Sequence, residues 1–129
     1  MKEPVFLTLA EVVEIHSNQI ELYGGSHGLR DIRLLESALS QPEASFGGEW
    51  LHRDLFEMAS AYAYHICQNH PFFDGNKRAA MVIALTFLEI NGLSILDPKQ
   101  MLLKAMLDIA DGRLDKKTFA QLLKNLVSR

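Results

Sequence analysis

The chain has 129 residues, and we expect residues 1–129 to form a single domain with its own hydrophobic core. Hydrophobic residues make up 48% and charged residues 22% of the chain, as is usual for a soluble globular protein. The 13 basic and 16 acidic residues give a net charge of −3. This balance argues against direct nucleic-acid binding, because such binding usually needs a basic face.

Targeting and redox features predict a cytoplasmic protein. The single cysteine, Cys67, excludes an internal disulfide and suits a reducing compartment. The N-terminal residues contain no long uncharged apolar run of the kind found in signal peptides. The most apolar stretch, residues 79–90, is too short to cross a bilayer, so we expect no membrane contact.

The first part of the chain predicts two helices separated by a glycine loop. Thr8 and Glu11 have the spacing of a capping box, and apolar residues recur after them at helical spacing. The run YGGSHG, residues 23–28, is typical of a loop because of its glycines. Asp31 begins a second, short helix, and Pro42 follows its end.

The middle of the chain predicts two longer helices joined by a short turn, after an irregular stretch over residues 43–53. Asp54 has the chemistry of an N-cap, and Pro71 ends the helix that follows because the residue before a proline avoids helical geometry. Gly75 begins the next helix, in which residues 79–90 are almost all apolar. A helix that is apolar on nearly all sides is buried, so we expect it at the centre.

The last part of the chain predicts two more helices. Asp97 and Pro98 indicate a cap and a first helical residue, and this helix is expected to run to about Asp111. A final helix is expected from Asp115 to Val127. We therefore predict an all-α fold without a sheet, a compact bundle of about six helices around a buried central helix.

The stretch HPFFDGNKR, residues 70–78, does not fit this plain scaffold. The helix that Gly75 begins exposes unpaired N–H groups and a partial positive charge at its first turn. Lys77 and Arg78 have the wrong sign for that position, but a bound phosphate would turn the repulsion into attraction. Because glycine lets an anion approach closely, we predict phosphate binding by Gly75, Asn76, Lys77 and Arg78.

The same stretch contains groups suited to catalysis. Asp74 offers a carboxylate, and Mg²⁺ typically binds one or two carboxylates together with phosphate oxygens. His70 can act near neutral pH as a base that takes a proton from an attacking hydroxyl. Phe72 is expected to point inward and anchor the loop. The side-chain amide of Asn76 can hold either the loop backbone or a phosphate.

A purely structural interpretation competes with this one. The stretch could be a turn between two helices in which the phenylalanines fill the core and Asp74 is an N-cap. For any single residue that interpretation is the more common one. It leaves His70, Asn76, Lys77 and Arg78 without a role, and sequences break local rules mainly at functional sites. The combination therefore favours a functional site.

The stretch resembles the signature of the Fic/Doc superfamily, H-x-F-x-(D/E)-G-N-(G/K)-R, and its lysine version is similar to the Doc, or death-on-curing, branch. The match covers His70, Phe72, Asp74 and residues 76–78, and most of the remaining chain is also Doc-like. The resemblance implies the toxin of a bacterial toxin–antitoxin module, with the all-α fold predicted above.

The resemblance also implies transfer of part of a nucleotide to a hydroxyl of a target protein. Typical Fic members transfer AMP and have a glycine at the position of Lys77 and a second arginine at that of Met81. Doc-like members transfer the γ-phosphate of ATP to a translation elongation factor. His70 would then be the base, Asp74 the Mg²⁺ ligand, and Asn76, Lys77 and Arg78 the phosphate-binding residues. Some Doc members have alanine in place of the glycine at position 75, and we expect little consequence.

Two other functions stay open at this point. A nucleotidyltransferase that transfers AMP would use the same base and metal, and a catalytically silent binding module would keep the fold and the phosphate site. The self-inhibitory motif (S/T)-x-x-x-E-(G/N) of many Fic proteins is not found in the sequence. Inhibition is therefore expected from a partner antitoxin, whose disordered tail folds as a helix into a groove.

Several other side chains have two interpretations. His16 lies on the apolar face of the first helix and is expected to be a core histidine. His52 and Arg53 could flank the cleft or lie exposed in a loop. Phe46 and Trp50 could form a flap that positions a target peptide, or they could anchor their loop in the core.

Overall fold

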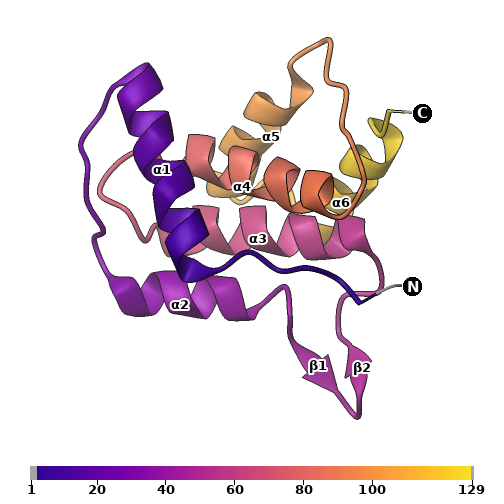
Figure 1. Ribbon diagram of the computed structural model, residues 1–129. Helices are drawn as coiled ribbons and strands as arrows, with labels where there is room; N and C mark the ends of the chain where they lie inside the picture. The colour runs from indigo at the N-terminus through magenta and orange to yellow at the C-terminus, as the bar shows by residue number, and fades with distance from the viewer. Residues whose placement is uncertain (1–2, 129) are drawn as a thin grey trace.

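Six α-helices and a short β-hairpin form the part of the chain that this computed structural model describes, residues 3–128 (Figure 1). The helices are α1 (Leu9–Tyr23), α2 (Ile32–Ser40), α3 (Leu55–Asn69), α4 (Asn76–Ile90), α5 (Met101–Ala110) and α6 (Lys116–Asn125). The all-α prediction with about six helices is confirmed. The expectation that no sheet forms is wrong, because β1 (Ser45–Phe46) and β2 (Glu49–Trp50) pair as an antiparallel hairpin within the predicted irregular stretch. Its strands are too short to show an alternating pattern.

α3 and α4 form the centre of the bundle and lie side by side in Figure 1, joined by the loop 70–75. α3 contacts α2, α4, α5 and α6, whereas α4 contacts α1, α3 and α5. All of residues 58–63 in α3 are buried, whereas Met81 and Leu85 of α4 stay partly exposed. The apolar helix predicted at the centre therefore shares that position with α3. Within residues 3–128, none of the helices combines the length and apolar character needed to cross a membrane.

Aromatic packing fixes the N-terminal segment to this central pair. The rings of Tyr62 and Phe87 are 5.1 Å apart, and Phe6 stacks on Phe87 at 5.7 Å. The hydroxyl oxygen of Tyr62 accepts a hydrogen bond from the N–H of Leu7 (3.0 Å). Burial of Tyr62 raises its pKa to about 12. The tyrosine therefore stays protonated and acts as a core side chain with a satisfied polar end.

Side-chain caps set where four of the helices begin, as predicted. Thr8 Oγ1 accepts from the N–H of Glu11 (3.1 Å), and Glu11 Oε1 accepts from the N–H of Thr8 (2.8 Å). Asp31, Asp54 and Asp115 each accept an N–H in the first turn of α2, α3 and α6. These acceptors satisfy N–H groups that have no partner inside the helix.

The start of α5 differs from the prediction. The helix begins at Met101, after Gln100 in a left-handed conformation (φ 53°), and not at Pro98. The carbonyl of Asp97 closes a turn with the N–H of Gln100 (3.2 Å). The carboxylate of Asp97 still caps α5, because it accepts from the N–H groups of Met101 (2.8 Å) and Leu102 (2.9 Å). The prediction of Asp97 as the cap is therefore confirmed, but the predicted helix start is wrong. The Asp97 carboxylate reaches α5 across a turn that the Asp–Pro pattern does not indicate.

Candidate functional site

His70 lies between the end of α3 and the turn that leads into α4. Its backbone is left-handed (φ 51°), and its N–H donates to the carbonyl of Ile66 (3.0 Å). This conformation is uncommon for a residue that has a side chain, and Pro71 keeps His70 out of helical geometry. His70 is exposed, so its imidazole can be reached by another molecule.

Arg30 binds the main chain of His70 and of the residue before it. Its Nε donates to the carbonyl of His70 (2.7 Å) and its Nη2 to the carbonyl of Asn69 (3.0 Å). A cation is favourable at a helix C-terminus, where the last carbonyls have no partner inside the helix. Arg30 therefore ties the segment before α2 to the end of α3.

Main-chain hydrogen bonds fix the rest of the loop. The N–H groups of Arg30 and Asp31 both donate to the carbonyl of Pro71 (2.7 and 3.1 Å). The N–H of Phe73 donates to the carbonyl of Gly28 (3.2 Å). The segment between α1 and α2 thus runs alongside the loop between α3 and α4 and sets its path.

Asp74 is exposed, and its carboxylate is held by two backbone N–H groups. Oδ2 accepts from Ser26 (3.0 Å) and Oδ1 from Gly75 (2.8 Å), and these bonds, that from Ser26 foremost, hold the pKa of Asp74 below its usual value. A Cβ added to Gly25 would lie 2.7 Å from Asp74 Oδ2, so glycine permits this close approach. The ionised carboxylate keeps lone pairs for a cation, which fits a Mg²⁺ ion that takes its other ligands from phosphate and water. Within residues 3–128, no cluster of three or more metal-ligating side chains is found.

Phe72 and His16 support the loop from below. Phe72 is 1% exposed, and its ring stacks on that of His16 at 3.8 Å with an angle of 4° between the planes. The Nε2 of His16 is 2.7 Å from the carbonyl oxygen of Asp74 and must donate, because a carbonyl can only accept. His16 is therefore a buried, satisfied core histidine, as predicted.

Asn76 has its side chain turned into the loop. Its Oδ1 accepts from the N–H of Phe72 (3.0 Å) and its Nδ2 donates to the carbonyl of Phe72 (2.9 Å), and the residue is 4% exposed. Of the two roles considered for this amide, the structure shows the hold on the loop backbone. The side chain of Asn76 is therefore not placed to bind a phosphate, and only its backbone N–H lies at the start of α4.

Gly75 is needed in this chain for two reasons. Its φ is +73°, and a Cβ added there would lie 3.0 Å from Cδ1 of Ile20. The left-handed region strains any residue that has a Cβ, and the contact with Ile20 adds to that strain. The expectation that alanine would be of little consequence at this position is therefore wrong for this backbone.

A pocket of about 390 Å³ lies at the N-terminus of α4. It is lined by His70, Phe73, Asp74, Gly75, Asn76, Lys77, Arg78 and Leu103. No side chain caps α4, so the N–H groups of its first turn have no partner from that source. Lys77 and Arg78 outnumber the one carboxylate, and the guanidinium of Arg78 lies 4.1 Å from the ring centroid of Tyr23. The pocket therefore attracts anions.

Comparison with known proteins decides the family. Residues 6–88 match the model of the Fic/DOC family. The chain belongs to this family. The Protein kinase doc of Escherichia phage P1 is 31% identical over 116 residues, which cover 90% of each of the two chains. The Toxin Doc of Mycolicibacterium smegmatis is 38% identical over 73 residues, which cover 57% of this chain and 56% of that relative.

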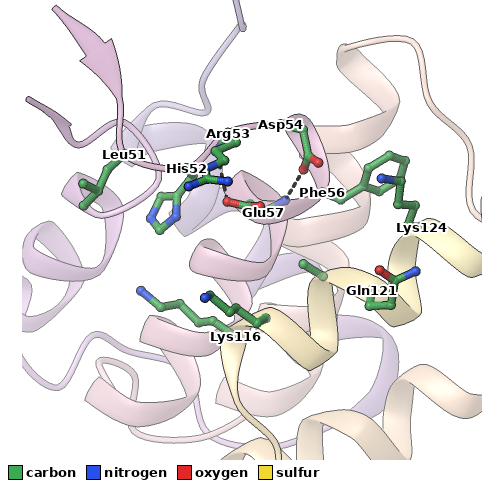
Figure 2. Close-up of a pocket in the computed structure, with 11 residues that line it drawn as sticks. Leu51, His52, Arg53, Asp54, Phe56, Glu57, Lys116, Gln121 and Lys124 are labelled. Atoms are coloured by element: carbon green, nitrogen blue, oxygen red, sulfur yellow. Dashed lines mark hydrogen bonds between the residues drawn. The ribbon is translucent and has the colours of Figure 1, made fainter.

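The structure of this Fic/DOC protein brings together the residues predicted to form the site, with Phe72 beneath them. His52 and Arg53 do not join them. They lie at the other end of α3 and line a different pocket (Figure 2). Trp50 is half-buried and packs edge-on against Phe6 at 5.3 Å, whereas Phe46 is 84% exposed. Trp50 therefore anchors the hairpin, and Phe46 does not.

Two supporting residues of the site were missed at the level of sequence. Arg30 and Ser26 contact the site from the segment between α1 and α2. The glycines of residues 24–28 were a signal, because all three have positive φ and Gly25 makes room for Asp74. The pattern indicated a loop, but it did not show which other loop this one would touch.

Proposed function

We propose that this Fic/DOC protein is a Doc-type toxin that transfers the γ-phosphate of ATP to a hydroxyl of a target protein. The observation that carries the proposal is the pocket at the start of α4. There an exposed imidazole, an ionised carboxylate and two cations surround a helix N-terminus that has no side-chain cap. A charged lysine at position 77 and a relative named Protein kinase doc support phosphoryl transfer over AMP transfer.

The phosphates of ATP bind at the N-terminus of α4. Its first N–H groups and the side chains of Lys77 and Arg78 offer donors of the correct sign. The ring of Tyr23 restricts the position of the Arg78 guanidinium. Asp74 would hold a Mg²⁺ ion, which would neutralise charge on the phosphates.

His70 acts as the base. It takes the proton of the target hydroxyl while the hydroxyl oxygen bonds to the γ-phosphorus, and the bond to the β–γ bridging oxygen breaks so that ADP leaves. The contact from Arg30 fixes the backbone of His70, which keeps the imidazole beside the anion-binding end of α4. Such positioning is a main source of rate in phosphoryl transfer.

Two partners are part of the proposal. One is an antitoxin, which is supported by the relative named Toxin Doc. Its disordered tail would fold as a helix on this protein. The other is the target, for which the resemblance to Doc proteins suggests a translation elongation factor.

The proposal is tested by incubating the protein with bacterial lysate and ATP labelled in the γ- or the α-phosphate. We expect protein to be labelled from the γ-position only. His70→Asn should reduce labelling by at least about 100-fold, and asparagine tolerates the left-handed backbone of position 70. His27→Asn, which changes an exposed histidine paired with Glu21, is the matched control and should label as the wild type does.

Each other outcome has a defined meaning. Label from the α-position would show nucleotidyl transfer and overturn the kinase proposal. No label from either position, in the presence of magnesium, would favour the silent binding module. Equal labelling by the wild type and His70→Asn would remove His70 from its proposed role.

A further inference from the structure

A second pocket, of about 590 Å³, lies between residues 51–57 and α6 (Figure 2). The start of α3 forms one of its walls, and His70 follows the end of the same helix. The two pockets are therefore separated by roughly the length of α3, about 22 Å for a helix of 15 residues. The second pocket has no part in the proposed catalytic function.

Basic side chains outnumber acidic ones in the lining of this second pocket. His52, Arg53, Lys116, Lys117 and Lys124 contribute to it, in a chain whose net charge is −3. Its two carboxylates are already engaged at the start of α3. The Asp54 carboxylate accepts a hydrogen bond from the backbone N–H of Glu57 (2.8 Å). The Glu57 carboxylate accepts one from the backbone N–H of Arg53 (3.0 Å), and dashed lines mark both bonds in Figure 2.

Lys116 is held in place without a carboxylate partner. Its Nζ lies 3.0 Å from Nε2 of His65 and donates to it, because an ammonium group has no acceptor. Its backbone carbonyl accepts from the Oγ of Ser60, which is buried in α3 (2.7 Å). No salt bridge joins Lys116 to an acidic group in residues 3–128. Two of its three N–H donors thus remain for another acceptor.

His52 has a buried polar atom that the fold does not satisfy. Its Nε2 is buried and has no hydrogen-bond partner among residues 3–128. An unsatisfied buried polar atom is rare in folded proteins and unfavourable. Figure 2 shows the His52 ring and Lys116 on opposite sides of the pocket. Both residues line the same pocket, and the buried Nε2 of His52 lies within its wall.

Cations outnumber carboxylates in this region, and the charge of Glu57 offsets theirs only in part at His52. Burial lowers the pKa of Lys116, and burial followed by the charge of Lys116 lowers the pKa values of His52 and His65, that of His65 to about 4. Mutual repulsion of this kind is relieved when an anion binds. The region therefore has both the donors and the potential that an anion requires.

We propose that this pocket binds a phosphoryl group, with Lys116 as its main donor, His52 in the wall beside it and Arg53, Lys117 and Lys124 at its rim. A phosphoryl group carries close to two negative charges and three acceptor oxygens, whereas a carboxylate carries one charge and two oxygens. Donors from two separate segments and an excess of cations match the phosphoryl group better. Free phosphate and the phosphates of a nucleotide share this chemistry.

The test is a titration of the full chain with inorganic phosphate and with pyrophosphate, followed by the imidazole signals in NMR spectra. Chloride keeps the ionic strength constant. We expect the His52 signals to shift and saturate with a Kd of about 1 mM or tighter. The midpoint of His52 protonation should rise by about one pH unit. His27 is the internal reference, and His70 reports on the catalytic pocket separately, so the two proposals can fail independently.

Three variants make the result specific. Lys116→Met should weaken phosphate binding at His52 at least about tenfold, the effect of losing one charge-assisted hydrogen bond. Lys116→Arg should retain most of the binding, which shows that the site still folds. Lys104→Met removes the same charge from α5, where Lys104 pairs with Asp108, and should have no effect.

The comparison of ligands decides the chemistry. Tighter binding of pyrophosphate than of phosphate would identify a polyphosphate as the source, and equal binding a single phosphoryl group. An adventitious response, in which chloride shifts His52 as phosphate does, would overturn the proposal. The same holds if Lys116→Met binds like the wild type, or if an unphosphorylated glutamate-rich peptide binds as tightly as phosphate.

Discussion

Arg30 donates a hydrogen bond to the main chain of His70, with 2.7 Å between its Nε and the carbonyl oxygen of His70. The two residues are 40 positions apart in sequence, yet this contact sets where the proposed base is carried. The left-handed backbone of His70 costs about 1–2 kcal/mol. The Arg30 guanidinium stabilises this conformation, because it donates to the carbonyls of both His70 and Asn69. Arg30 is thus a positioning residue for the proposed reaction.

Arg30→Met should lower kcat at least about tenfold and change the KM for ATP by less than about threefold, because it displaces the base and leaves the phosphate-binding residues in place. Arg30→Lys should restore only part of the rate, since one ammonium group does not reproduce the two-pronged contact. Steady-state kinetics measure both constants. Arg33→Met, on the exposed surface of α2, is the control. A rise in KM with unchanged kcat would place Arg30 in ATP binding instead.

Gly75→Ala should destabilise the fold by about 1–3 kcal/mol, because the left-handed backbone and the contact with Ile20 both oppose a Cβ. Gly112→Ala is a matched control, since its φ is +76° but no atom lies within 4 Å of the added Cβ. Urea unfolding of the two variants separates backbone strain from the contact. Equal destabilisation by both would show that Ile20 contributes nothing.

Asn76→Ala should reduce stability by about 2 kcal/mol, because it leaves the N–H and carbonyl of buried Phe72 without partners. Asn76→Asp should also destabilise the loop, since a carboxylate can accept from that N–H but cannot donate to the carbonyl. Asn18→Ala, at an exposed position of α1, controls for loss of an amide. Thermal melts measure the effect. A stable Asn76→Ala protein that no longer binds ATP would return Asn76 to the phosphate-binding role.

The low pKa of His65, about 4 against an ordinary 6.5, predicts a pH dependence of stability. Between these values the unfolded chain binds a proton at His65 and the folded chain does not, so stability falls as pH falls through this window. His65→Gln should make the free energy of unfolding fall less between about pH 7 and about pH 5. Chemical denaturation at the two pH values measures this. An unchanged slope in the variant would contradict the low pKa.

Local chemistry made the helices predictable. The caps at Thr8, Asp31, Asp54 and Asp115 act within three residues of their own position, and such short-range rules can be read from a sequence. The motif at residues 70–78 was also recognisable, because it concentrates cations at a helix start where they oppose the dipole.

Contacts between distant segments were not predictable in the same way. Ser26 and Arg30 reach the site through backbone groups and a long side chain, and neither leaves a periodic pattern. The side-chain amide of Asn76 kept two possible roles at the level of sequence, because its direction depends on how the loop folds around Phe72. His52 was expected in a loop or at the cleft, and nothing in the sequence indicates that one of its ring nitrogens is buried.

The most direct test of the central claim is calorimetric titration of the protein with ATP and magnesium. If the first turn of α4 grips the phosphates, the wild type binds ATP. Lys77→Met should then bind at least about tenfold more weakly, the effect of one lost charge-assisted contact. Lys104→Met, which loses the same charge on α5, should bind as the wild type does. A flat titration of the wild type, or equal affinity in the wild type and Lys77→Met, would contradict it.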